Sequence, residues 1–223
     1  MRYYDRQDAG QRLARRLKRF ENNDIVVLAL PRGGIVLGVE VARVLGAPLG
    51  LVLVRKIGHP AYSEYAIGAV AEEEAPIYNE DELLGIDKAW LKSAVASARQ
   101  LIEHRHELYY EDGFVPPNVE GKTVILVDDG IATGLTMKAA VRAVQNKQAK
   151  RVIVAVPVAS QESVGTLETI ADEVIVLDDP RKFLGAVGAH YQQFEQVDDE
   201  EVRTLLWGIQ NHVLETTAKP IRH

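Results

Sequence analysis

Short apolar segments alternate with amphipathic segments along most of the chain. Near-continuous apolar runs are typical of strands that are buried on both faces of a sheet. Such runs occupy positions 25–30, 51–54, 124–127, 152–158 and 174–177, and 66–71 is a further candidate. Between them, apolar residues recur at the spacing of a helix. This helical spacing covers 6–20, 35–45, a long segment after Asp87, 133–147, 160–171 and 199–213.

This order of strands and helices predicts an α/β fold class. Strands that alternate with helices form a doubly wound, mostly parallel sheet with helices on both faces. Ligands bind such sheets at the carboxyl ends of the strands. The loops expected there or nearby are 31–34, 55–65, 128–136 and 157–160. We expect a single domain over 1–223, with a core at about 1–178 and a small C-terminal cap or hood, ending in a helix, at about 179–223.

The composition of the 223-residue chain excludes several classes of function. Because there is no cysteine, a disulfide framework, a thiolate nucleophile and a cysteine-ligated zinc site are excluded, and we expect a cytoplasmic protein. No apolar run is long enough to cross a bilayer, so we expect no membrane partner. The net charge of -6 argues against a nucleic-acid partner, because proteins that follow the phosphate backbone use basic surfaces.

The strongest candidate site follows the strand at 124–127. Asp128 and Asp129 come directly after this strand, and a turn of small residues then leads into a helix. The backbone N–H groups of this turn, the hydroxyls of Thr133 and Thr136 and the helix N-terminus suit one phosphate. Two adjacent carboxylates accept hydrogen bonds from the hydroxyls of a sugar. The segment therefore predicts a site for a pentose 5′-phosphate, and the alternative is a structural turn.

This segment resembles the diphosphoribosyl-binding signature of the type I phosphoribosyltransferases, which use phosphoribosyl diphosphate (PRPP) to make nucleotides. The resemblance implies that Asp128 and Asp129 are catalytic residues that contact the ribose hydroxyls. Gly130 departs from the signature, which usually has an aliphatic residue there, and we expect the change to affect loop flexibility more than ligand chemistry. The implied substrate-binding residues are Gly130, Ile131, Ala132, Thr133, Gly134, Leu135 and Thr136, of which Ala132, Thr133, Gly134 and Thr136 would bind the 5′-phosphate.

Two further segments resemble parts of the same family in order and spacing. The loop that contains Arg32, Gly33 and Gly34 is similar to the family's diphosphate loop, and the alternative is a plain turn between strand and helix. The basic pair Arg55 and Lys56 is similar to the start of the flexible loop in adenine- and xanthine-type members, where such a pair faces the diphosphate. The alternative for this pair is a solvated strand end.

Resemblance to the base-binding parts of the family is weaker. Glu64 and Tyr65 resemble the acid and aromatic cluster of the adenine-type loop, which implies a general acid or base and a side chain that closes over the site; a solvated loop is the alternative. Phe183 and Leu184 resemble the hood of hypoxanthine-guanine enzymes, where an aromatic ring stacks on the purine and the next backbone group reads its edge. His190 stands where a guanine-reading acid is expected, which disfavours guanine, and a core aromatic is the alternative for Phe183.

The resemblance implies an Mg²⁺-dependent pentosyltransferase of nucleotide metabolism and purine salvage. Mg²⁺ would be held mainly by PRPP oxygens, without direct side-chain ligation. The partners would be PRPP, a small-molecule base and a second copy of the chain in a homodimer. Two alternatives remain open: a non-catalytic regulatory protein that binds PRPP or a nucleotide, and a phosphoribosyl-nucleotide hydrolase or phosphorylase.

Overall fold

A five-stranded parallel sheet lies at the centre of the computed structural model, which describes all residues except 1, 22, 64, 112–113, 218–223 and the side chains of 210–217. Its strands are β1 (Ile25–Ala29), β2 (Leu49–Leu51), β6 (Thr123–Val127), β7 (Arg151–Val156) and β8 (Glu173–Val176). They pair in the order β2-β1-β6-β7-β8, and every neighbouring pair is parallel. All residues of β1 are buried, as expected for a strand covered on both faces.

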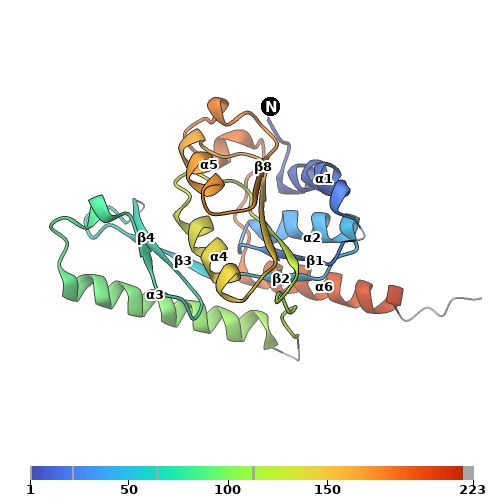
Figure 1. Cartoon of the computed structure of the whole chain (residues 1–223), viewed down its shortest axis with the longest axis horizontal. Helices are drawn as coiled ribbons and strands as arrows, with labels where there is room; N and C mark the ends of the chain where they lie inside the picture. The colour runs from blue at the N-terminus through green and yellow to red at the C-terminus, as the bar shows by residue number, and fades with distance from the viewer. Residues whose placement is uncertain (1, 22, 64, 112–113, 218–223) are drawn as a thin grey trace, which may run out of the picture.

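Helices cover both faces of this sheet (Figure 1). Val27 and Ile125 belong to the apolar cluster on one face, and Val26 and Leu126 belong to the cluster on the other, because successive strand residues point to opposite sides. The first cluster includes residues of α1 (Arg6–Leu17), α2 (Gly34–Leu45) and α6 (Asp199–Thr217). The second includes residues of α4 (Leu135–Asn146) and α5 (Gln161–Glu168). The doubly wound α/β fold is confirmed.

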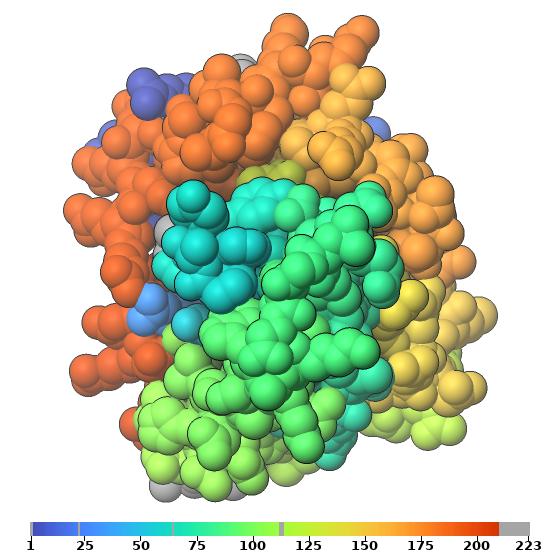
Figure 2. Space-filling view, turned by 90° about the vertical axis from the view of Figure 1, so that its left-hand side faces the viewer, coloured from blue at the N-terminus to red at the C-terminus, as the bar shows by residue number. Residues whose placement is uncertain are grey.

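A second sheet projects from this core together with a long helix (Figure 1). Its antiparallel strands are β3 (Val54–Gly58), β4 (Ala66–Ala71) and β5 (Ile77–Tyr78), and the helix is α3 (Lys88–Tyr109). We call these four elements the arm. Figure 2 views the molecule from the arm side, where the hairpin of β3 and β4 (cyan) and α3 (green) fill much of the visible face.

The prediction of one strand at 51–54 was wrong. That apolar run is divided between two sheets, because β2 ends at Leu51 and β3 begins at Val54. Val52 and Leu53 are buried in the link between them. Hydrophobicity stays continuous across the link because the end of β2 and the link are buried and Val54 is half-buried, so the pattern does not reveal the change of sheet. The strand at 66–71 exists as expected, but it pairs antiparallel within the arm.

Helix ends follow the local signals in the sequence. Asp87 caps α3, and its carboxylate accepts hydrogen bonds from the N–H groups of Ala89 and Trp90. Ser160 caps α5 through the N–H of Ser163. Gly46 follows α2 with a φ of 62°, the left-handed conformation that ends many helices.

The segment after β8 joins the two ends of the chain. It contains the short helices η4 (Pro180–Lys182) and η5 (Val187–His190), and we call residues 180–191 the hood. The N–H of Tyr3 donates to the carbonyl of His190, and the N–H of Gln192 donates to the carbonyl of Tyr3, each at 2.8 Å. The N-terminal residues are thereby fixed beside the hood, while α6 continues onto the core.

Candidate functional site

The reversal of strand order between β1 and β6 creates the candidate site. The chain leaves β1 toward β2 on one side of the sheet and leaves β6 toward β7 on the other. The loops after these two strands therefore diverge, and the crevice between them is the usual ligand position in this class of fold. Arg32 lies in the first loop, and Asp128 and Asp129 begin the second.

Gly33 and Gly34 lie directly against the acid pair. A Cβ atom on Gly34 would lie 2.8 Å from the carbonyl oxygen of Val127 and 3.1 Å from Oδ1 of Asp128. A Cβ atom on Gly33 would collide with the Asp129 carboxylate. Only glycine allows this close approach at both positions. The structure thus brings together the Arg-Gly-Gly loop and the two acids that the sequence selected separately. The peptide bond between Pro31 and Arg32 is cis.

Burial dominates the electrostatics of the acid pair. It raises the pKa of Asp128 well above the ordinary carboxyl value, and the neighbouring Asp129 charge raises it further. Burial also raises the pKa of Asp129, but there the positive charge of Arg6 opposes the shift. The N–H of Asp129 donates to Oδ1 of Asp128 at 2.8 Å. The two carboxylates are therefore held close together at a cost that one cation offsets in part.

Arg6 is the residue at this site that sequence reasoning missed. Its Nε atom lies 2.7 Å from Oδ2 of Asp129, and its guanidinium carbon lies 3.7 Å from the centre of the Phe194 ring. The hydroxyl of Tyr191 donates to the carbonyl of Asp129 at 2.5 Å. Arg6 and Tyr191 are far from Asp129 in the sequence and belong to no local motif, so a single sequence carries no signal that would have found them.

The turn after the acids has the features of an anion site. Gly134 has a φ of 77°, and α4 begins after it without a side-chain cap. Its first N–H groups therefore point out of the helix end, where an anion can accept them. Thr133 is exposed, whereas Thr136 and Leu135 are half-buried. The turn that the sequence assigned to the 5′-phosphate thus has a suitable backbone conformation.

Two serines from the next loop fasten this turn. The hydroxyls of Ser160 and Ser163 both lie 2.7 Å from the carbonyl oxygen of Ala132. The N–H of Ile131 donates to the carbonyl of Val158, and the carbonyl of Ile131 accepts from the N–H of Ser160. Because the backbone of Ile131 is used within the fold, ligand contacts are expected from Ala132 onward.

Close packing explains why a glycine stands at position 130, and the sequence did not reveal this packing. A Cβ atom there would lie 2.6 Å from Cγ1 of Val187 and 2.7 Å from Cγ2 of Val158. Its φ is not in the left-handed region, so backbone freedom does not explain the residue. The glycine lets the hood pack against the acid loop, and close packing rather than loop flexibility accounts for the departure from the signature.

Tyr65 lines a pocket of about 620 Å³ beside the phosphate turn. The same pocket is lined by Thr133, Gly134 and Lys138. The Tyr65 hydroxyl donates to a Glu82 carboxylate oxygen at 2.6 Å, and 48% of the residue is exposed. That Tyr65 closes over the site stays a prediction. Glu64, the predicted general acid or base, lies outside the described residues.

Arg55 and Lys56 lie in a different groove from the acid pair. This groove has a volume of about 550 Å³ and runs between the β3–β4 hairpin and α3, with Trp90 and Leu101 among its lining residues. No residue of the loops after β1 and β6 lines it. Contact of the basic pair with diphosphate stays a prediction.

The hood is closed on itself around His190. The rings of Phe183 and His190 stack with centres 5.3 Å apart, and the N–H of Leu184 donates to Nε2 of His190 at 3.0 Å. Burial lowers the pKa of His190, which favours the neutral ring that this contact requires. The Leu184 N–H expected to read a base is thus engaged within the hood, and stacking of Phe183 on a base stays a prediction.

The chemistry of the side chains fits a magnesium ion that PRPP would largely hold. Among the described residues, no group of three or more histidine, cysteine, aspartate or glutamate residues is arranged to hold a metal ion. Asp128 and Asp129 offer carboxylate oxygens, which Mg²⁺ accepts together with phosphate oxygens and water.

Within the same described residues, no helix combines the length and apolar character needed to cross a membrane.

Comparison with known proteins identifies the relatives of this chain. Residues 3–192 match the family model described as the phosphoribosyl transferase domain. Proteins of two Mycobacterium tuberculosis strains, each named a putative phosphoribosyl transferase, are 39% identical over 203 residues, which is 91% of this chain and 46% of theirs. The chain therefore spans about half the length of these curated relatives. The crystal structure of the protein TT1426 from Thermus thermophilus is 43% identical with a TM-score of 0.78, covering 93% of this chain and 99% of that one.

Proposed function

Since the chain belongs to the phosphoribosyl transferase domain family, we propose that it transfers the 5-phosphoribosyl group of PRPP to a nitrogen of a nucleobase-like acceptor and releases diphosphate. One observation carries the proposal. The Gly33–Gly34 backbone lies against the acid pair at the crevice between β1 and β6, and the uncapped start of α4 follows the acids after a short turn. This set supplies partners for the diphosphate, the ribose and the 5′-phosphate of one ligand.

In the proposed reaction, the acceptor nitrogen forms a bond to the anomeric carbon as the bond from that carbon to the diphosphate oxygen breaks. The diphosphate leaves with the electron pair, and the acceptor gives up its N–H proton. Asp128 and Asp129 accept hydrogen bonds from the ribose hydroxyls, which fixes the ring for in-line displacement. Glu64 is the proposed acid or base for the acceptor proton.

The charge of the leaving group is balanced by several groups. Arg32, Arg55 and Lys56 are the proposed cations, and the N–H groups from Ala132 to Thr136 hold the 5′-phosphate. Bound with PRPP, Mg²⁺ neutralises part of the diphosphate charge. Because the whole chain has a net charge of -6, we expect binding of PRPP to depend strongly on Mg²⁺.

In this proposal, the hood binds the acceptor. Phe183 offers a ring for stacking and Tyr65 closes the opposite side, which suits a flat heterocycle such as a purine and a role in purine salvage. We also propose a homodimer in the cytoplasm.

Diphosphate release tests the proposal directly. The protein is incubated with Mg²⁺ and PRPP, alone and with each member of a panel of free bases, and released diphosphate is measured with an enzyme-coupled assay. Release that depends on one base, with the corresponding nucleotide formed in equal amount, is the expected result. Release without any base would instead indicate a hydrolase. Absence of both binding and release would contradict the proposal.

A regulatory protein that binds PRPP is the second candidate. The internal bond from the Leu184 N–H to His190 favours it, because this bond occupies a donor expected to read the base. Calorimetry with PRPP and Mg²⁺ separates the two candidates. Binding with no base-dependent release across the panel would favour the regulatory protein.

A further inference from the structure

Arg6 is held at the acid pair by contacts from two separate segments. Its Nε atom donates to Asp129, its Nη1 atom donates to the carbonyl of Glu195 at 2.5 Å, and its guanidinium carbon lies over the Phe194 ring. The side chain of Arg6 is 12% exposed and that of Asp129 is 15% exposed. A buried, multiply bonded ion pair of this kind has one well-defined geometry, unlike an exposed pair.

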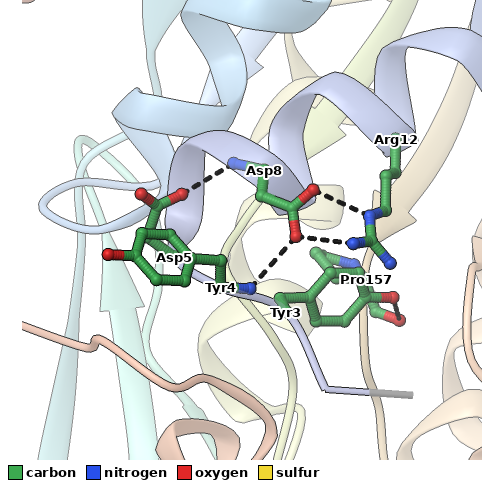
Figure 3. Close-up of polar contacts among 6 residues, drawn as sticks. All are labelled: Tyr3, Tyr4, Asp5, Asp8, Arg12 and Pro157. Atoms are coloured by element: carbon green, nitrogen blue, oxygen red, sulfur yellow. Dashed lines mark hydrogen bonds and ion pairs between the residues drawn. The ribbon is translucent and has the colours of Figure 1, made fainter.

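The backbone that carries Arg6 is also fixed. Asp5 caps the start of α1 by accepting the N–H of Asp8 at 2.8 Å, and Asp8 in turn accepts the N–H of Tyr4 (Figure 3). The Tyr3 hydroxyl donates to the carbonyl of Pro157, which joins this segment to the end of β7. The first turn of α1 is therefore anchored where it delivers Arg6 to the acid loop.

The ion pair lies against the proposed diphosphate loop as well. A Cβ atom on Gly33 would lie 2.8 Å from Nε of Arg6 as well as colliding with Asp129. Of the two acids, Asp129 is the one that bonds Arg6, while Asp128 bonds the N–H of its neighbour. The pair thus gives the two carboxylates different partners.

From these contacts we infer that Arg6 is a positioning residue, which holds the Asp129 carboxylate in the charged state and orientation that the ribose hydroxyls require. This inference rests on the proposed function. Without Arg6, the Asp129 carboxylate would lose the cation that it bonds, and the acid pair would take up a proton more readily. A protonated carboxyl is a poorer acceptor for a sugar hydroxyl.

Other ionisable groups around the pair set the background. Asp128 and the Tyr191 hydroxyl face Asp129 from its own loop and from the segment after β8, and Tyr3 lies behind Tyr191. The groove on the far side of Arg6 is lined by Asp5, Glu195 and Glu201. Most of the ionisable groups named around Arg6 are therefore acids. Replacing Arg6 with a neutral residue makes the local charge more negative.

The test compares Arg6→Gln, Arg6→Lys and the matched control Arg12→Gln by the pH dependence of PRPP binding and turnover from pH 5 to 9. Arg12 pairs with Asp8 on the same helix and lies over the Tyr3 ring, so its replacement removes the same kinds of contact away from the acids (Figure 3). We expect Arg6→Gln to raise the Kd and KM for PRPP at least about ten-fold with a smaller change in kcat. In the pH profile of Arg6→Gln, the loss of PRPP binding on the acidic side should begin at a higher pH than in the wild type.

Arg6→Lys should keep the acidic side of the wild-type pH profile, because lysine retains the positive charge. Its KM should rise a few-fold, because lysine lacks the planar set of donors of the guanidinium group. Arg12→Gln should match the wild type. Unchanged profiles in a folded Arg6→Gln protein, or equal shifts in both glutamine variants, would overturn the inference. If Arg6→Gln does not fold, Arg6→Lys decides, and a KM equal to that of the wild type would overturn it. Failure of the wild type to bind PRPP would instead refute the proposed function.

Discussion

The parallel core and the arm hold their proposed site residues in opposite ways. In the core, Asp128 and Asp129 follow a strand whose last four residues are all buried, and packed loops fix both acids. In the arm, Arg55 is exposed on a three-stranded sheet, and only Ala98, Ile102 and Tyr109 of the 22-residue helix α3 are buried.

The core therefore suits groups that must be placed accurately, and the arm suits groups that must move. The core places charges accurately and accepts the cost of burying two acids side by side. In the arm, β4 is largely buried, but β3 and α3 bury few of their residues, and elements with few buried contacts open at low free energy. A segment of this kind suits groups that must approach a ligand after it has bound.

The largest expected effect is the loss of catalysis when the core acids are neutralised. Asp128→Asn with Asp129→Asn should lower kcat/KM for PRPP by about 10²- to 10⁴-fold, since each hydrogen bond to a charged group contributes about 1.5–3 kcal/mol. The diphosphate assay measures the change. Glu72→Gln with Glu73→Gln is the matched control, because these adjacent acids follow strand β4 of the arm. Equal losses in the two double variants would break the comparison.

Truncation of one leucine in each region should show the difference in packing. Leu126 in β6 is fully buried, whereas Leu91 in α3 is only half-buried. We expect Leu126→Ala to lower the free energy of unfolding by about 2–5 kcal/mol, and Leu91→Ala to lower it by less than about 1 kcal/mol. Urea unfolding followed by circular dichroism measures both. Similar values would indicate that the arm is packed as tightly as the core.

Removal of the basic pair of the arm should affect the ligand more than the fold. Arg55→Gln with Lys56→Gln should lower kcat/KM for PRPP about ten-fold, because exposed cations contribute modestly to each contact. The melting temperature should stay close to that of the wild type. Lys88→Gln with Lys92→Gln on the exposed side of α3 gives a control of equal charge. Wild-type kinetics in the Arg55 and Lys56 variant would remove the arm from the proposed site.

The smallest expected effect is a gain in stability at the core acids. Because the pKa of Asp128 is raised above its ordinary value of 3.8, the folded protein binds this proton more tightly than the unfolded chain. The associated stability is present at low pH and is lost as pH rises through the raised pKa. Asp128→Asn should therefore melt about 2–4 °C above the wild type at pH 8, if about 1 kcal/mol is recovered.

The pH dependence distinguishes this cause from a general change in packing. The difference in melting temperature should shrink toward pH 4, where the wild-type carboxyl is protonated. Differential scanning fluorimetry between pH 4 and 8 measures it. A difference that grows toward low pH would contradict burial of a charged Asp128 as the cause.

The predictable parts of the molecule were those with a local cause. Buried strands such as β6 and β7 appeared as apolar runs, and the helix predicted after Asp87 begins there because capping acts within a few residues. The acid loop was recognisable for the same reason. Its chemistry lies in consecutive residues at the end of a strand.

The parts that could not be predicted depend on long-range contacts. The run at 51–54 gave no sign that it crosses between sheets, since its apolar residues continue through the buried link to the half-buried Val54. Gly130 was interpreted through flexibility, although its neighbours Val158 and Val187 decide the residue. The positions of Arg55 and Lys56 depend on how β3 packs on α3, and the hydrophobic periodicity of the sequence does not predict this packing.

The sequence by itself determined the α/β class, the order of strands and helices in the parallel core and the residues at the ends of β1 and β6, because these follow from periodicity and from contacts between near neighbours. Only the tertiary structure decided that Arg6 bonds Asp129, that Ser160 and Ser163 hold Ala132, and that His190 takes the Leu184 N–H. Those contacts join residues whose approach is set by packing of whole elements. The buried charge they stabilise exists only once the chain has folded around it.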